Sequence, residues 1–209
     1  MQRLNRTLMT QMQQIHADKK SVFIRSTSVI CVLLIFFQTS FSQPSKEEAK
    51  SAFEYLNKVR QNPGKFSKEI GAELNKIEPL PSLIWNDTLA KVAELKAMDM
   101  GKRNFFAHVN PEGKGINIMV HEAGYLLPPE WIEDKKENFF ESINAGTETG
   151  IGAIQDLILD KYDKGKGHRK HLLGMNDFYR ELTHIGIGHV KIEGSKYTWY
   201  TVVIVAKQK

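Results

Sequence analysis

The chain has 209 residues, of which 41% are hydrophobic and 10% are aromatic, and it contains one cysteine. This length suits one or two domains, and the apolar content is enough to fill a core. The composition excludes an intrinsically disordered chain, a collagen-like repeat and a protein with many membrane spans.

The excess of positive charge lies at the amino end. The formal net charge is +5, from 29 Lys and Arg residues against 24 Asp and Glu residues. Residues 1–42 contain five of the basic residues and one of the acidic ones, which leaves 24 basic and 23 acidic residues in 43–209. Such a balanced remainder lacks the phosphate-neutralising surface of a nucleic-acid-binding protein. We therefore expect no nucleic acid among the partners.

Residues 1–42 have the pattern of a signal peptide. Three basic residues precede an uncharged apolar run at 29–37, and Ser40 and Ser42 occupy the −3 and −1 positions of a cleavage site before Gln43. The alternative is a membrane anchor, but this run spans about 14 Å as a helix and a bilayer core needs about 30 Å. We therefore predict cleavage, a secreted or periplasmic location, and no stable membrane span in the mature form.

The mature chain is expected to be one domain without disulfides. The single cysteine, Cys31, lies inside the apolar run, so cleavage would leave neither a disulfide framework nor a thiol nucleophile. A short lead-in at 43–50 would precede the domain at 51–209, because no low-complexity linker and no repeat interrupts that stretch.

The first predicted helix begins with a capping box, since Ser45 stands three residues before Glu48. It stops at the Asn-Pro-Gly sequence at 62–64. Apolar spacing predicts two further helices, a short one at 116–123 and another at 152–162.

The best-defined helix lies between these. Asn86 or Asp87 can cap it, and Gly101 is expected to end it. Apolar residues three or four apart predict one inward face. The residues expected to be buried on and beside this helix are Trp85, Leu89, Ala93, Ala97 and Met100.

The sequence period changes to two at the carboxyl end. Ile185, Ile187 and His189 alternate with smaller or polar neighbours, and 197–206 is rich in aromatic and β-branched residues. The turn sequence at 193–195 predicts an antiparallel hairpin from these two runs. Both faces of the second run carry apolar residues, so we expect helices to cover both sides of the sheet.

Spacing alone identifies no catalytic or zinc site. The sequence at His121 and Glu122 starts like a zincin helix, but residue 125 is Tyr125 where that motif needs a second histidine. His168 and His171 are three apart, which is a weak signal for a shared helical face. The sequence also lacks a Gly-x-Ser-x-Gly nucleophile elbow and a phosphate-binding glycine loop.

Six short motifs follow one another in a specific order. They are the run PSLIWNDTLA at 81–90, Phe-Phe-Ala-His at 105–108, Ala-Gly-Tyr at 123–125, Glu-Asn at 137–138, Gly-His-Arg-Lys-His-Leu-Leu at 167–173 and Ile-Gly-Ile-Gly at 185–188. The ordered set resembles the CAP superfamily of cysteine-rich secretory, antigen 5 and pathogenesis-related 1 proteins. It is most similar to the cysteine-free bacterial branch, the SCP-like extracellular proteins, and the resemblance extends from about residue 52 to residue 205.

This resemblance implies an α+β fold, a three-layer α-β-α sandwich with a central, mainly antiparallel sheet and a cavity. Two histidines and two acids line the cavity in the family, and the histidines can hold a divalent metal such as zinc. The matching positions are His108, Glu137 and His168. The second acid has no clean match, and Asp160 and Asp163 are its candidates.

The matched residues allow two interpretations. Neutral imidazoles are good zinc ligands, and a carboxylate can orient an imidazole through its second nitrogen. The same residues can instead form a hydrogen-bonded cluster that pins two loops together. The tryptophans Trp85, Trp131 and Trp199 either line an apolar ligand groove or pack in the core, and packing is the more common role.

Three functions follow. We favour a secreted protein that binds a lipid, a glycan or another protein in the cavity, because no nucleophile or base of recognisable geometry accompanies the cluster. The second is a zinc-dependent hydrolase in which His108 and His168 hold the metal and Glu137 activates water. The third is an envelope structural module with the cluster as scaffold. Fold resemblance alone does not establish catalysis.

Overall fold

The centre of the computed structural model, which describes residues 42–209, is a five-stranded sheet. All of its strand pairs are antiparallel except β2 with β4. The predicted hairpin is confirmed, with β4 and β5 as neighbours in the middle of the sheet. The strand order is β1 (Ser42–Pro44), β4 (His184–Ile192), β5 (Trp199–Ala206) and β3 (Glu141–Ala145), and β2 (Ile84–Trp85) also pairs with β4.

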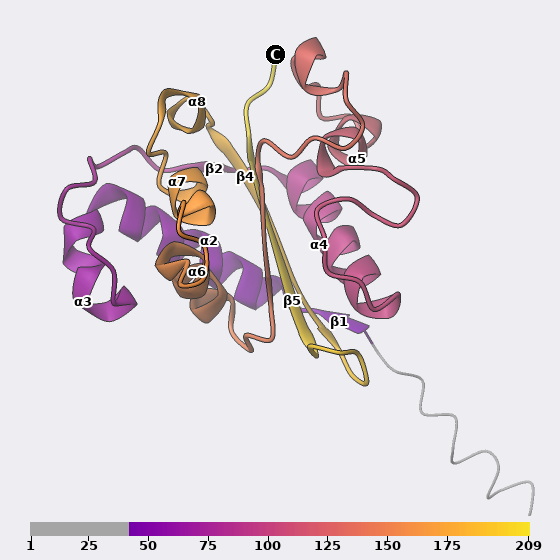
Figure 1. Ribbon diagram of the computed structural model, residues 1–209, viewed down its shortest axis with the longest axis horizontal. Coiled ribbons are helices and arrows are strands. Elements are labelled where there is room, and N and C mark those ends of the chain that lie inside the picture. The colour runs from indigo at the N-terminus through magenta and orange to yellow at the C-terminus, as the bar shows by residue number, and fades with distance from the viewer. Residues whose placement is uncertain (1–41) are drawn as a thin grey trace, which may run out of the picture. The chain divides into compact units, whose positions relative to one another are not determined.

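Helices cover both faces of this sheet, as the apolar character of both faces predicted (Figure 1). One layer consists of α4 (Asp87–Lys102) and the shorter α5 (Ile116–Glu122). The helices of the other side are α2 (Lys46–Gln61), α3 (Ser67–Ile70), α6 (Gly150–Leu159) and α7 (Gly167–Leu172), followed by α8 (Asp177–Arg180). The molecule is therefore an α+β sandwich. No helix within 42–209 has the length and apolar character needed to cross a membrane.

The predicted cap of α2 forms, but only in part. The Oγ of Ser45 accepts a hydrogen bond from the backbone N–H of Glu48 (3.3 Å). The Glu48 carboxylate does not reach back to complete the capping box. It accepts instead from the backbone N–H of Gly150 (2.7 Å), at the start of α6. This bond ties the beginnings of two neighbouring helices together.

Helix α4 follows its prediction closely. Asn86 is the cap, because its Oδ1 accepts from the backbone N–H of Leu89 (3.0 Å). The predicted apolar face of the helix is fully buried. The helix runs one residue beyond Gly101, and this glycine serves packing rather than termination. A Cβ at that position would lie 2.6 Å from Ile192 and 2.9 Å from Tyr200.

Two glycines of β4 let α4 lie directly on the sheet. A Cβ on Gly186 would lie 2.1 Å from the backbone nitrogen of Ala90, and one on Gly188 would lie 2.2 Å from that of Glu94. Both glycines are therefore required by the close approach of two backbones. This contact fixes the distance between the helix and the middle of the sheet.

The three tryptophans have different environments. Trp131 is buried in the core, whereas Trp199 is half-buried and stacks on His189 with ring centroids 5.2 Å apart. The prediction that Trp85 is a core residue is wrong in part, since it is also half-buried. It lies on the short strand β2, and its indole N–H donates to the Asp87 carboxylate (2.9 Å), which keeps that end of the ring at the surface.

The predicted signal peptide at 1–42 lies outside the described residues except for Ser42. Export and cleavage therefore stay predictions.

Candidate functional site

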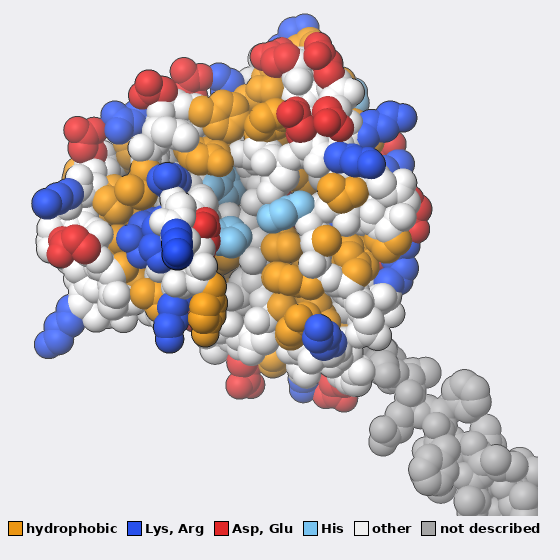
Figure 2. Space-filling model, in the orientation of Figure 1, with side chains coloured by type: hydrophobic (Ala, Val, Ile, Leu, Met, Phe, Trp, Pro, Cys, Tyr) orange, Lys and Arg blue, Asp and Glu red, His pale blue; other side chains and the backbone are white. Residues whose placement is uncertain are grey.

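A polar pocket with a volume of about 270 Å³ lies where the loop after α4, the start of β3 and the start of α7 meet. Histidine side chains gather in a hollow near the centre of the face shown in Figure 2. The pocket contains the two predicted histidines and a third, His171. Its lining residues are His108, Asn138, Phe139, Glu141, Ser142, Asp163, Gly167, His168, His171 and Tyr179.

His108 is held by a buried carboxylate. Its Nδ1–H donates to Oε2 of Glu141 (2.7 Å), whose side chain is 0% exposed while that of His108 is 38% exposed. Asn138 braces this pair: its Oδ1 accepts from the backbone N–H of Glu141 (2.9 Å) and its Nδ2 donates to the Glu141 carbonyl (3.1 Å). The Asn138 Nδ2 lies 2.8 Å from the same Nδ1, but both nitrogens are donors in this tautomer, so the hydrogen bond that holds the ring is the one to Glu141. The imidazole is therefore fixed at Nδ1, and Nε2 remains for a ligand.

A buried lysine lies behind this pair. Lys96 of α4 is fully buried, and its Nζ donates to the backbone carbonyl of His108 (2.9 Å). Burial lowers the pKa of Lys96, and the negative charge of Glu141 opposes that change. The second carboxylate oxygen of Glu141, Oε1, is buried without a hydrogen-bond partner. The Glu141 carboxylate thus favours the charged form of the buried lysine below the pocket.

His168 is held in the same way by Asp160. This aspartate ends α6 in a left-handed conformation (φ 48°), and this conformation ends the helix three residues before its predicted end. Its carboxylate accepts from both the backbone N–H (3.0 Å) and the Nδ1–H (2.9 Å) of His168. The carboxyl end of α6 is thereby joined to the first turn of α7.

The other candidate acid, Asp163, has a different role. Its carboxylate accepts from the backbone N–H groups of Gly167 and Gly165, both at 2.7 Å. The bond from Gly167, then that from Gly165, lowers the pKa of Asp163. Asp163 lines the pocket, but the acid that contacts His168 is Asp160.

The third matched residue, Glu137, does not line the pocket. The acid on His108 is Glu141, because the Asn138 side chain closes a turn that brings the first residue of β3 under the imidazole. Glu137 precedes this turn and is half-buried beside it. The sequence period predicts no strand at 141–145, so no local pattern points to Glu141. The Glu-Asn motif therefore identified the bracing asparagine but not the acid.

His171 and Ser142 form a pair that resembles part of a catalytic triad. The Ser142 Oγ and the His171 Nδ1 are 2.7 Å apart, and the two residues are 1% and 3% exposed. Burial lowers the pKa of His171 to about 3, and the charge of His168 adds to this effect. Its Nε2 is buried without a partner, so no acid orients the ring. A weak base beside an inaccessible hydroxyl is a structural pair, not a nucleophile.

The donor set does not fit a resident zinc ion. His108 and His168 each use Nδ1 for a carboxylate and leave Nε2, as metal-bound histidines do. Among residues 42–209, however, no three His, Cys, Asp or Glu side chains are placed to hold one metal ion. Catalytic zinc takes three protein ligands and structural zinc takes four. These two imidazoles supply only part of such a site.

Comparisons with known proteins give one family. The model of the cysteine-rich secretory protein family, CAP, matches residues 53–205. The uncharacterized protein YkwD of Bacillus subtilis (strain 168) is 29% identical over 162 residues, which cover 77% of this chain and 49% of that protein. The chain thus spans about half the length of this relative.

One solved structure with a TM-score above 0.5 shares the fold. An outer surface protein from Borrelia burgdorferi aligns with a TM-score of 0.54 and 20% identity, over 82% of this chain and 100% of that one. An extracellular protein with an SCP domain from Bacillus anthracis str. Ames aligns with a TM-score of 0.46 and 20% identity, over 78% of this chain and 44% of that one.

Proposed function

Because the chain belongs to the cysteine-rich secretory protein family, we propose that it is an exported protein that binds a small, hydroxyl-rich ligand between His108 and His168. Family membership gives the fold and does not establish catalysis. The family's secretory members and the surface location in the name of the Borrelia protein support export of this chain.

The observation that carries the proposal is the pair of half-exposed imidazoles, each fixed at Nδ1 by its own carboxylate. In its neutral form such an imidazole presents Nε2 as a hydrogen-bond acceptor. Two fixed acceptors in one pocket suit a ligand with two hydroxyl groups. Phe139 and Tyr179 add aromatic surface to the same pocket. A volume of about 270 Å³ suits a ligand no larger than a single sugar ring.

The arrangement favours binding over hydrolysis. The hydrolase alternative needs Glu137 as a base, and this residue does not line the pocket. Glu141 is buried and already accepts from His108. A glycan is therefore the ligand class that we select from the lipid, glycan and protein alternatives.

The test is a titration of the purified protein with single sugars, followed through the imidazole signals in NMR spectra. We expect the signals of His108 and His168 to shift with one common affinity. His184 is the control, because it is half-buried at the start of β4 and does not line the pocket. Binding should be lost in His108→Ala and kept in His184→Ala. Shifts confined to histidines outside the pocket, or no response to any sugar, would contradict the proposal.

A further inference from the structure

A pair of aromatic rings lies at the surface beside the polar pocket. Phe106 and Tyr197 have ring centroids 5.7 Å apart and ring planes inclined by 59°. Phe106 is 41% exposed, and Tyr197 is half-buried. Single exposed apolar residues are common on soluble proteins, but two rings side by side offer a surface that can bind a ligand.

This aromatic pair is continuous with the pocket. Phe106 stands two residues before His108, so their Cα atoms are at most about 7.6 Å apart. Phe106 and Ala107 are exposed and the His108 side chain is 38% exposed, so the described chain leaves the stretch from ring to imidazole open to solvent. Figure 2 shows hydrophobic side chains gathered directly beside the histidines of the hollow. A ligand that extends out of the pocket on this side therefore meets the Phe106 ring.

Hydrogen bonds join the two loops that carry the rings. The Asn104 Oδ1 accepts from the backbone N–H of Lys196 (3.1 Å), which connects the loop after α4 to the turn between β4 and β5. The backbone N–H of Tyr197 donates to the hydroxyl of the buried Tyr200 (3.4 Å). The rings are therefore held together by the protein before any ligand arrives.

The residue after Tyr197 is strained. Thr198 has φ 63°, which is uncommon for a β-branched residue. The backbone N–H of Trp199 donates across it to the Tyr197 carbonyl (2.7 Å), and a three-residue turn with positive φ at its centre is rare. Such strain persists only where the surrounding structure enforces it, and it clusters at ligand sites.

The flat face of a sugar suits this surface. Its C–H groups carry partial positive charge, whereas the face of an aromatic ring carries partial negative charge. Lys196 is exposed, and its Nζ lies 5.0 Å from the Tyr197 ring centroid, where it can donate to sugar hydroxyl groups. The pocket has room for no more than one sugar ring, so a second sugar would lie outside it, over Phe106.

We propose that the ligand is an oligosaccharide whose end sugar lies between His108 and His168 and whose next sugar stacks on the ring of Phe106. The oligosaccharide extends the sugar binding proposed above for the pocket and depends on it. Phe106 would then select for chain length, because a single sugar in the pocket does not reach its ring.

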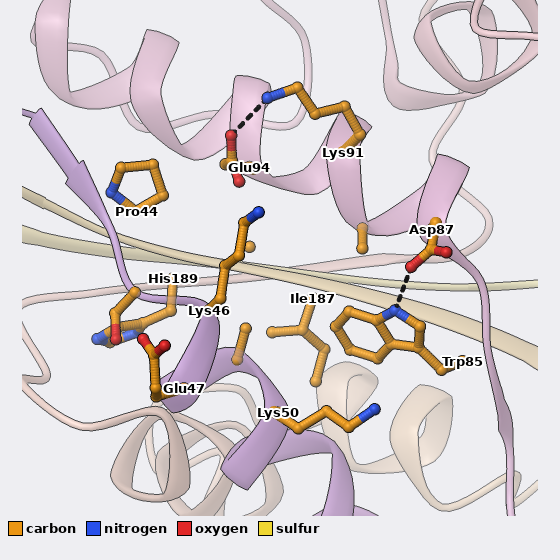
Figure 3. Close-up of a pocket in the computed structure, with 14 residues that line it drawn as sticks. Pro44, Lys46, Glu47, Lys50, Trp85, Asp87, Lys91, Glu94, Ile187 and His189 are labelled. Atoms are coloured by element: carbon orange, nitrogen blue, oxygen red, sulfur yellow. Dashed lines mark hydrogen bonds and ion pairs between the residues drawn. The ribbon is translucent and has the colours of Figure 1, made fainter.

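A second aromatic pair at the surface supplies the control. Trp85 and Phe53 have ring centroids 5.4 Å apart, and Trp85 lines a groove of about 700 Å³ between the first turns of α2 and α4 (Figure 3). This groove shares no lining residue with the polar pocket. Its polar side chains engage one another, since Lys91 pairs with Glu94 (2.6 Å) and the Trp85 indole N–H donates to Asp87 (2.9 Å). Loss of the Trp85 ring should therefore leave sugar binding unchanged.

The experiment compares glucose with cellotriose, and N-acetylglucosamine with chitotriose, in calorimetric titrations of the purified protein. We expect the trisaccharide of the sugar that the pocket accepts to bind about tenfold more tightly than the single sugar. Phe106→Leu should remove this advantage and leave the affinity for the single sugar unchanged, because it replaces the ring with an apolar side chain. Phe106→Trp should keep the advantage, and the matched control Trp85→Leu should alter neither affinity.

The NMR signals of the aromatic side chains locate the second sugar. The ring signals of Phe106 and Tyr197 should shift with the trisaccharide but not with the single sugar, while those of His108 and His168 shift with both. Equal affinity for the two, with the histidine signals shifted by both, would overturn the oligosaccharide proposal and leave sugar binding in the pocket intact. A trisaccharide advantage that survives in Phe106→Leu would overturn the role of Phe106. Absence of binding by all four sugars would overturn both proposals.

Discussion

Two regions of this molecule are held together by different forces. Between α4 and the sheet, the contacts are apolar and fully buried, and the helix backbone touches two glycines of β4. Around the pocket, three loops are joined by polar pairs between histidines and Glu141, Asp160 or Ser142. The first region therefore determines the stability of the fold. The second determines the position and charge of a few side chains, so it should respond to pH and to single carboxylates.

The strongest way to break the first region is Gly188→Ala. The new Cβ would lie 2.2 Å from the Glu94 nitrogen and 2.4 Å from the Ala93 carbonyl carbon, and backbone atoms cannot rotate away. The helix must leave the sheet, so we expect a loss above about 4 kcal/mol in the free energy of unfolding, measured in urea. Gly194→Ala in the β4–β5 turn is the control. It has φ 77° and open space, so it should lose only about 1 kcal/mol.

The same difference explains what the sequence could predict. Helix α4 and the hairpin were predictable because their burial repeats with a fixed period, and the Ile-Gly-Ile-Gly run was part of the family pattern. The residues that line the pocket do not recur with any fixed spacing along the sequence. They come from loops whose course depends on single bonds, such as the turn closed by Asn138. That turn decides that Glu141 and not Glu137 lies under His108, and no local pattern reports it.

The packing of the first region can also be tested without a clash. Leu89 is fully buried between α4 and the sheet. Leu89→Ala should cost about 3 kcal/mol, from lost burial and the cavity left behind. Leu95→Ala is the matched control, since Leu95 is on the same helix and 46% exposed. A loss at Leu89 no larger than that at Leu95 would show that the helix face is assigned wrongly.

Acid should act on the second region through His171. Burial lowers its pKa from 6.5 to about 3 in the folded protein. Between these values the unfolded chain binds a proton that the folded protein does not. The contribution of His171 to the free energy of unfolding is therefore complete above pH 6.5. It falls as the pH drops below 6.5, by about 2 kcal/mol at pH 5.

Urea unfolding at pH 7, 6, 5 and 4 measures this slope. His171→Asn should reduce this slope by the amount that corresponds to the uptake of about one proton on unfolding. Burial lowers the pKa of His189 as well, so a smaller slope of the same sign should remain in both proteins. An unchanged slope in the variant would mean that His171 is solvated in the folded state.

The smallest expected effect is the coupling free energy that distinguishes Glu141 from Glu137 as the partner of His108. A double-mutant cycle with His108→Ala and Glu141→Gln should show a coupling of at least about 0.5 kcal/mol, because the two side chains share a hydrogen bond at 2.7 Å. The coupling should stay modest, since the imidazole is 38% exposed. A parallel cycle with Glu137→Gln should be additive within about 0.5 kcal/mol. Coupling to Glu137 alone would require the turn at Asn138 to open and the segment before β3 to reverse. The Glu141 side chain would then leave its buried position, and the pocket would contain the acid that family matching selects.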